Sequence, residues 1–254
     1  MHVLVCVKRV PAPGARIVLT DDGLAIDTRH LGFTVSPHEE CAVEEAVRLT
    51  EAGGGRSTVL TLGPDVAEEQ LRTAISMGVG DGVLLATEQP EWDPRATAAA
   101  IAAAVADLED ERGGFDLILL GAESADAANH QVGIRLAHAL GRPVVTGVKG
   151  IDPADAEVTL RRDVAEGHEI YRLPLPAVAC VKEGLNLPRY PSMRGRLTAK
   201  KAPIDRREVA PTTAGLTPVG LRTAPVAEPE TVVLGHGADA APAIVAMLEE
   251  VGVL

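Results

Sequence analysis

The first 150 residues alternate short apolar runs with segments of helical pattern, and this alternation limits the possible folds more than any other feature. It predicts an α/β fold with a mostly parallel sheet and helices on both faces. An Asp-Asp-Gly turn adds a β-hairpin excursion at residues 18–26. The expected strands are residues 2–7, 58–62, 82–86, 115–120 and 144–148, and the expected helices are residues 37–52, 64–77, 93–111 and 129–140.

The pattern changes after Gly150. The elements expected there are an antiparallel pair at residues 157–162 and 169–173, a buried strand at 177–181 and a last helix at 240–251. Residues 202–229 are rich in Pro and Thr and show little periodicity. We expect them to form an extended arm that needs another surface to lie on.

Composition argues against several classes of function. The formal net charge is −12 and only five residues are aromatic, so neither phosphate-backbone binding nor base stacking on a nucleic acid is expected. Three distant cysteines form neither a disulfide framework nor a zinc pattern, and no metal site is expected. No run approaches the roughly 18 apolar residues of a membrane span, and the N-terminal run is too short for a signal peptide. We therefore expect a cytoplasmic protein without direct membrane insertion.

Residues 117–141, LILLGAESADAANHQVGIRLAHALG, indicate a ligand site. A buried strand ends at Gly121, a loop follows, and a helix is expected from Asn129. Ligands bind beyond the carboxyl ends of parallel strands, and free N–H groups at a helix N-terminus attract phosphate. The N–H groups from Asn129 to Gly133 are thus a candidate phosphate site, with Asp126 as a helix cap or ribose ligand. An ordinary strand–helix loop with an Asn cap is the alternative.

Residues 185–201, LNLPRYPSMRGRLTAKK, carry five positive charges and no acid within an acidic chain. They follow the apolar run at 177–181, which would display them at the edge of a rigid scaffold, where binding residues are common. The segment is either a partner-binding loop or a solvated basic turn.

Several motifs carry a family resemblance. They are CVKRVPAP at residues 6–13, SPHEECAVEEAVRL at 36–49, the loop at 121–133, and LPAV at 175–178 followed by Asn-Leu-Pro-Arg-Tyr and Ala-Lys-Lys in the basic segment. Spread nearly collinearly over residues 1–205, they resemble the β subunit of electron transfer flavoproteins. The hairpin at 160–180 resembles the family's signature, but Ala165 stands where the turn usually has Asp. His130 and Val132 likewise replace the family's common Asn and Thr.

The resemblance implies that this chain binds AMP as a structural nucleotide. Backbone N–H donors do not depend on the side chain, so a phosphate site tolerates the replacements at His130 and Val132. His38 matches a position that is aromatic in some members and would lie near the flavin. The implied nucleotide-binding residues are Cys6, Ser36, Pro37, His38, Glu39, Leu62, Gly121, Ala122, Glu123, Ser124, Ala125, Asp126, Asn129, His130, Gln131 and Val132.

The resemblance also implies an electron carrier subunit rather than an enzyme, with no catalytic residue in this chain. Its partner would be an α subunit that holds the shared FAD. The heterodimer would accept electrons from flavin dehydrogenases of the acyl-CoA dehydrogenase type, as in fatty acid β-oxidation, and pass them to a quinone oxidoreductase. The implied docking residues are Leu185, Arg189, Tyr190, Met193, Arg194 and Arg196, with Met193 as an apolar anchor at the loop tip.

The expected organisation is a Rossmann-like nucleotide-binding domain over residues 1–205, with a docking loop at 183–201. A C-terminal arm and helix over 206–254 would pack on the partner subunit. Two alternatives stay open. One is a flavin-bifurcating relative with a second FAD in place of AMP, and the other is a stand-alone nucleotide-binding module of stress-protein type or a hydrolase of the same fold.

Overall fold

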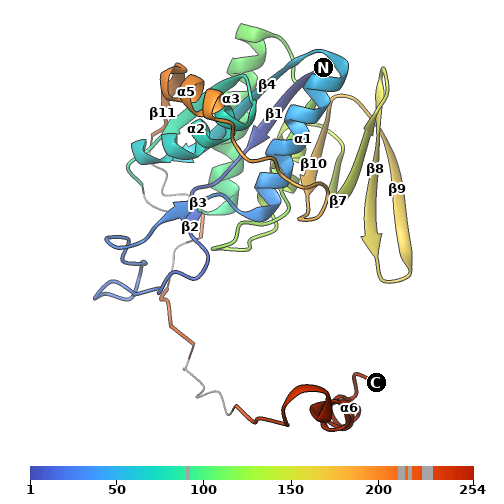
Figure 1. Cartoon of the computed structure of the whole chain (residues 1–254). Coiled ribbons are helices and arrows are strands. Elements are labelled where there is room, and N and C mark those ends of the chain that lie inside the picture. Colours follow the sequence, from blue (N-terminus) through green and yellow to red (C-terminus); the bar gives the residue numbers. More distant parts are fainter. Residues whose placement is uncertain (90–91, 211–214, 217–218, 225–230) are drawn as a thin grey trace.

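The computed structural model describes residues 1–89, 92–210, 215–216, 219–224 and 231–254, and its framework is a nine-stranded sheet (Figure 1). The strand order is β11-β5-β4-β1-β6-β10-β7-β8-β9. Neighbours from β11 to β7 pair in parallel, whereas β8 and β9 continue the sheet antiparallel. The strands are β1 (His2–Cys6), β4 (Arg56–Gly63), β5 (Asp81–Ala86), β6 (Leu117–Gly121), β7 (Val144–Pro153), β8 (Glu157–Val164), β9 (Gly167–Pro174), β10 (Ala177–Val181) and β11 (Ile204–Glu208), and β2 (Val10–Pro11) pairs separately with β3 (Phe33–Thr34).

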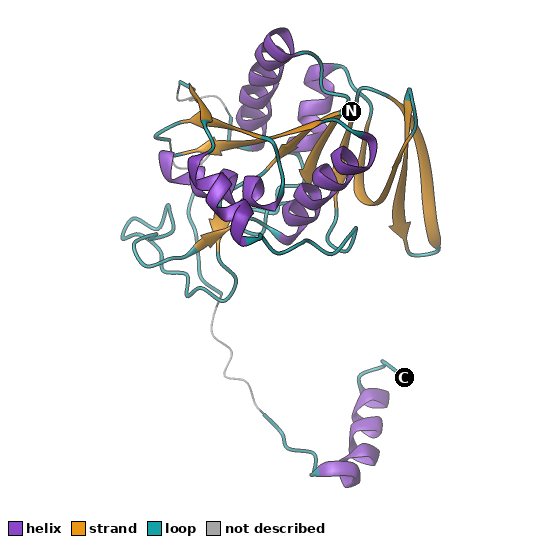
Figure 2. Ribbon diagram, turned by 45° about the horizontal axis from the view of Figure 1, so that its top comes forward, coloured by secondary structure: helices purple, strands orange, loops and turns teal. Residues whose placement is uncertain are grey.

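Helices cover both faces of the sheet, as the sequence predicts (Figure 2). Along β1, Val3 and Val5 belong to one buried cluster and Leu4 and Cys6 to the other, because successive side chains of a strand point to opposite faces. The first cluster includes residues of α1 (Pro37–Gly53), α2 (Glu68–Met77) and α5 (Met193–Lys201), and the second includes residues of α3 (Pro94–Arg112) and α4 (Val132–Leu140).

Local signals explain where two of the helices begin. At α1, Ser36 and Glu39 form a reciprocal capping box ahead of Pro37. At α3, the Asp93 carboxylate accepts hydrogen bonds from the N–H groups of Arg95 (2.8 Å) and Ala96 (3.4 Å). The helix expected over 64–77 is divided into a short 3₁₀ turn, Asp65–Ala67, and α2.

Two regions outside the parallel part of the sheet confirm antiparallel predictions. Strands β8 and β9 form the expected hairpin and extend beyond the rest of the sheet in Figure 1. The excursion at 18–26 is closed by an antiparallel bridge between Leu19 and Ile26. Gly167, after the Ala165-Glu166 turn, has φ +137°, a conformation that favours glycine.

The segment expected to form an arm begins differently from the prediction. Residues Ile204–Glu208 are not free but form β11, which pairs with β5 at the sheet edge. Further along, the Leu221 N–H donates to the carbonyl of Gly23 (2.8 Å). Residues 211–214, 217–218 and 225–230 of the predicted arm lie outside the described residues.

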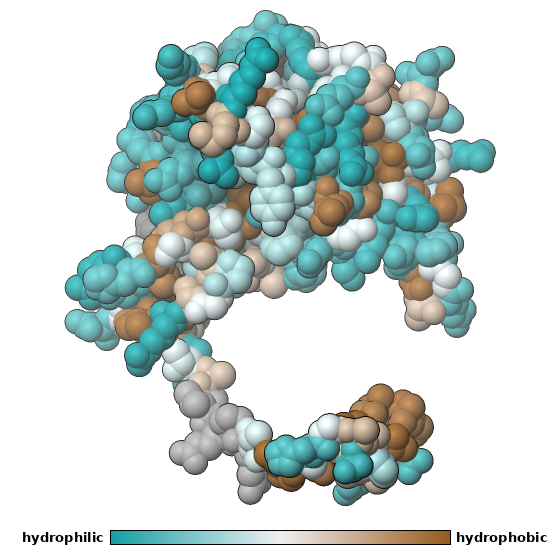
Figure 3. All heavy atoms as spheres, viewed as in Figure 1, coloured by the Kyte–Doolittle hydropathy of each residue, from teal (hydrophilic) through white to brown (hydrophobic). Residues whose placement is uncertain are grey.

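The last helix, α6 (Ala241–Glu250), follows a 3₁₀ turn at Gly237–Ala240 and buries none of its residues. It stands clear of the α/β body, and apolar side chains gather on it and beside it (Figure 3). Its exposed apolar residues include Ile244, Val245 and Met247. Within the described part of the chain, no helix has both the length and the apolarity needed to cross a membrane.

Candidate functional site

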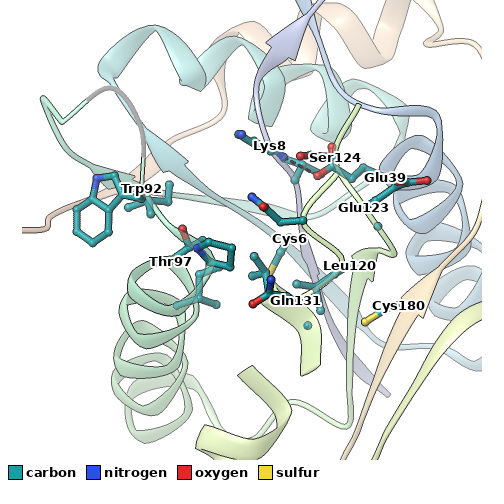
Figure 4. A pocket seen from close by; sticks show the side chains of 18 of the residues that line it. Cys6, Lys8, Glu39, Trp92, Thr97, Leu120, Glu123, Ser124, Gln131 and Cys180 are labelled. Carbon is teal, nitrogen blue, oxygen red and sulfur yellow. Dashed lines mark hydrogen bonds between the residues drawn. The ribbon is translucent and has the colours of Figure 1, made fainter. Parts of the chain in front are cut away.

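The main cavity opens at the carboxyl ends of β1, β4 and β6, where the topology rule places a ligand. It encloses about 970 Å³, including its open mouth. In Figure 4, Lys8, Glu123 and Ser124 gather on one side, while Trp92 and Thr97 come from the other. The lining residues are Cys6, Val7, Lys8, Glu39, Leu60, Leu62, Gly63, Gln89, Trp92, Pro94, Thr97, Ile101, Leu120, Gly121, Ala122, Glu123, Ser124, Asn129, His130, Gln131, Val132, Gly133 and Cys180.

The loop between β6 and α4 forms one wall, and it corrects the predicted helix start. The helix begins at Val132 and not at Asn129. The reason lies in the backbone, because Ala128 (φ +46°) and His130 (φ +52°) are left-handed and cannot belong to a right-handed helix. The N–H groups of the first helical turn, which have no intrahelical acceptor, therefore start at Val132.

Lys8 supplies positive charge beside this loop. Its ammonium lies 2.8 Å from the Asp126 carboxylate. Burial alone would raise the pKa of Asp126, but the Lys8 charge and hydrogen bond outweigh it and hold that pKa below its usual value. The Asp126 carboxylate also accepts from the Ala127 N–H (2.8 Å). Asp126 thus stabilises the loop from outside the cavity. It neither caps α4 nor lines the cavity.

Glu39 is a buried carboxylate at the edge of the cavity. It accepts hydrogen bonds from the Lys8 N–H (3.0 Å) and from the N–H and hydroxyl of Ser36 (both 3.1 Å). Burial nevertheless raises its pKa to about 7. Gly121 permits this arrangement, because a Cβ there would lie 2.8 Å from the Glu39 Cγ. Glycine is therefore needed where the strand passes the start of α1.

The floor of the cavity depends on close packing between α4 and β10. A Cβ on Gly133 would lie 2.2 Å from the Cys180 Sγ, so only glycine allows this approach. Cys6, Cys41 and Cys180 are free and buried. Burial raises the pKa of Cys180 to about 12 and raises that of Cys6 further, so both thiols stay protonated at neutral pH.

A chain of polar contacts joins the cavity wall to the segment after β10. The Glu183 N–H donates to His38 Nδ1 (3.0 Å), and His38 Nε2 lies 3.4 Å from the Glu123 carboxylate. His130 Nε2 contacts the other Glu123 oxygen at 2.8 Å. A second hollow shares this wall and is lined by His38, Ala122, Glu123, His130, Thr146, Gly147, Arg162, Asp163, Val164 and Lys182.

The basic segment is only partly a loop. Its second half is helix α5, so Met193 is not at a loop tip but is the first residue of a helix capped by Ser192. Arg189 donates to both Glu44 (2.8 Å) and Glu51 (2.8 Å). Leu185 is partly buried against the core. By contrast, Tyr190 and Met193 are 95% and 75% exposed, and Arg194 and Arg196 are exposed as well.

The family model of the electron transfer flavoprotein domain matches residues 23–212. The chain belongs to this family. It is 33% identical over 211 residues to electron transfer flavoprotein subunit beta of Bacillus subtilis (strain 168), covering 82% of this chain and 79% of that protein. It is 31% identical over 208 residues to acryloyl-CoA reductase electron transfer subunit gamma of Anaerotignum propionicum (80% and 76%). It is 34% identical over 201 residues to protein FixA of Rhizobium meliloti (strain 1021) (78% and 67%).

Eleven of the sixteen nucleotide-binding residues predicted for this electron transfer flavoprotein chain line one cavity. The other five lie behind it or beside it. Ser36 and Pro37 start α1, and the Ser36 hydroxyl accepts from the Ala125 N–H (3.1 Å). His38 faces the second hollow and Asp126 pairs with Lys8. The eleven are Cys6, Glu39, Leu62, Gly121, Ala122, Glu123, Ser124, Asn129, His130, Gln131 and Val132.

Sequence reasoning missed the wall opposite the β6–α4 loop. Gln89 and Trp92 follow β5, and Pro94, Thr97 and Ile101 belong to the first two turns of α3. The sequence contained a signal for this wall. The Asp-Pro pair that starts a helix after an apolar run marks another strand–helix junction, at the same carboxyl-end edge of the sheet. Among the described residues, no group of three or more His, Cys, Asp or Glu is placed to hold a metal ion.

Proposed function

We propose that this member of the electron transfer flavoprotein family is the β subunit of a heterodimeric electron carrier, and that it binds AMP structurally. The observation that carries the proposal is the cavity at the carboxyl ends of β1, β4 and β6. Its chemistry fits a nucleotide, since the free N–H groups of Val132 and Gly133 and the Lys8 ammonium favour a phosphate. Leu62, Ile101 and Leu120 offer an apolar surface to a base.

In this proposal the partner is an electron transfer flavoprotein α subunit that holds FAD. The exposed apolar residues of α6 are consistent with burial on another chain. Bound FAD would supply the redox chemistry, accepting electrons from flavin dehydrogenases of the acyl-CoA dehydrogenase type and releasing them to a quinone oxidoreductase. The residues of this chain bind the nucleotide, form part of the wall around the flavin, with His38 as the proximal side chain, and dock the partners.

A bifurcating relative with a second FAD in this cavity is the second candidate. It is supported by the similarity to proteins named acryloyl-CoA reductase electron transfer subunit gamma and FixA. The lining residues fit the adenosine phosphate portion of either nucleotide. The number of flavins per heterodimer distinguishes the two candidates.

The test is to coexpress the chain with its α subunit, purify the complex without denaturation, and quantify released nucleotides by chromatography with mass detection. One FAD and one AMP per heterodimer are expected. Two FAD and no AMP would move the protein to the bifurcating class. A flavin-free monomer that carries ATP or no nucleotide would refute both and favour a stand-alone nucleotide-binding module.

A further inference from the structure

Helix α5 packs against α2 through small residues. Gly195 and Ala199, one turn apart, form its inner face, and Ala199 is buried. The two helices lie side by side (Figure 1). The approach is so close that a Cβ on Gly195 would lie 2.3 Å from the Ser76 carbonyl oxygen. The separation of α5 from α2 is therefore fixed by the absence of a side chain at Gly195.

The N-terminus of α5 is capped, and its C-terminus is held by a side chain of α2. At the N-terminus the Ser192 hydroxyl accepts from the Gly195 N–H (2.9 Å). At the C-terminus the Arg72 guanidinium donates to the carbonyls of Ala199 and Ala202, the latter at 3.3 Å. A cation in this place satisfies carbonyls that the helix leaves free. Because the Gly195–Ser76 approach and the Arg72 hydrogen bonds both hold α5 against α2, its outer face has a defined orientation.

That outer face carries an apolar pair between two positive flanks. At about 100° per residue, Met193 and Leu197 lie within about 40° of each other, opposite Gly195 and Ala199. Met193 is 75% exposed and Leu197 is 63% exposed. The same geometry places Arg194 and Lys201 along one side of the pair and Arg196 and Lys200 along the other.

We propose that Leu197 is a second docking anchor, acting with Met193 as one i, i+4 pair. The occupant would be a groove on an electron-donating partner protein, with two apolar subsites one helical turn apart and acidic residues on both rims. The charge pattern favours a groove with acidic rims, because residues 185–201 contain no acid in a chain of net charge −12. The inference rests on the proposed function and adds a residue and a geometry to it.

Paired anchors on one helix face are how a helix binds an apolar groove, whereas a single anchor suffices for a loop. Rigid mounting matters here, since a helix that is already ordered loses little conformational freedom on binding. Gly195 acts as a positioning residue in this scheme, because it sets the direction in which Met193 and Leu197 point without touching the partner.

The test uses the holo heterodimer with an acyl-CoA dehydrogenase as the electron donor, and measures KM for the carrier and kcat separately. Leu197→Ala is expected to raise KM at least fivefold with little change in kcat, as removal of an interface anchor does. Leu197→Met should restore most of the affinity. The matched control is Leu187→Ala, which removes an equally apolar side chain that is 85% exposed but lies outside the helix. Its KM should stay within twofold of the original.

Gly195→Ala separately tests the close packing of α5 on α2. It keeps both anchors and all charges, yet it should raise KM because α5 must move away from Ser76. Flavin content and the far-ultraviolet circular dichroism of each variant establish that the heterodimer is intact.

The outcomes separate the inference from the proposed function. If Met193→Ala raises KM and Leu197→Ala does not, the paired-anchor inference is overturned and the docking role of the segment stands. If neither substitution changes KM, docking occurs elsewhere, and both the paired-anchor inference and the docking role of the segment are overturned. A rise in KM with Leu197→Ala that Leu187→Ala does not reproduce supports the pair.

Discussion

Replacing Arg189 by alanine should destabilise the protein, because this residue holds the basic segment against α1. Its guanidinium makes two hydrogen bonds to Glu44 (2.8 and 3.1 Å) and two to Glu51 (2.8 and 3.0 Å). The Glu44 side chain is only 3% exposed, whereas that of Glu51 is 60% exposed. The bond to Glu44 should therefore carry most of the stabilisation.

The expected loss of unfolding free energy depends on how deeply the Arg189–Glu44 pair is buried. Breaking a fully buried ion pair costs roughly 3–5 kcal/mol. Arg189 is 34% exposed and Arg48 remains 2.8 Å from Glu44, so we expect a smaller loss of about 2 kcal/mol on the scale of charged hydrogen bonds. For a chain of this size that loss lowers Tm by about 4–8 °C. Glu51→Gln breaks an exposed pair and should cost at most about 0.5 kcal/mol.

The assay is urea unfolding of the original protein, Arg189→Ala, Glu44→Gln and the double variant. The double-mutant cycle should give a coupling energy of about 1–2 kcal/mol between Arg189 and Glu44. Burial alone would raise the pKa of Glu44, but Arg189 lowers it overall. The stabilisation is hence fully present above the ordinary glutamate pKa and is lost as the pH falls through the lowered value. The coupling should shrink below about pH 4.

An unchanged free energy of unfolding in Arg189→Ala would refute this reasoning. If the same variant raised KM for the carrier in the dehydrogenase assay, Arg189 would be a partner contact, as the sequence resemblance alone implies. Loss of stability together with weakened docking would mean that the network positions the docking segment.

Three further predictions concern the cavity and the second hollow beside it. Gly133→Ala should lower nucleotide content by at least tenfold, because its Cβ would meet the Cys180 Sγ at 2.2 Å, and full nucleotide content after purification would contradict this. Glu39→Gln should flatten the pH dependence of the free energy of unfolding between about pH 4.5 and 7. The Glu39 pKa is raised to about 7 in the folded protein, so the original protein should lose roughly 2–4 kcal/mol of that free energy as the pH rises through this range. An identical slope in both proteins would show that Glu39 stays ionised. His38→Ala removes the acceptor of the Glu183 N–H, so amide hydrogen exchange at Glu183 should speed up severalfold, and unchanged protection would mean that the 3.0 Å bond contributes nothing.

Much of the fold could be predicted because its signals are local. The Asp93-Pro94 pair marks the start of α3, and the box formed by Ser36 and Glu39 marks that of α1. The alternation of β1 side chains between two clusters follows from strand geometry. The carboxyl ends of parallel strands then place the cavity, which explains why most predicted nucleotide-binding residues share one site.

The remaining features depend on contacts that no local pattern encodes. The helix α4 starts late because Ala128 and His130 adopt left-handed backbone, for which alanine is no signal and histidine only a weak one. Helix α5 contains a glycine and many charges, and its stability comes from packing on Ser76 and from Arg72, both distant in sequence. Tertiary contacts of this kind override weak propensity.

The two edges of the sheet differ in charge and in exposed apolar surface. At one edge, four of the five residues of β11 are charged, and Arg207 and Asp205 form ion pairs with Glu111 and Arg112 of α3. Charged edge strands resist the addition of a further strand, which is how natural sheets avoid aggregation. At the other edge β9 exposes Ile170 and carries fewer charges. We therefore expect a strand from another molecule, whether in a productive complex or in a misassembled oligomer during expression, to add at β9 rather than at β11.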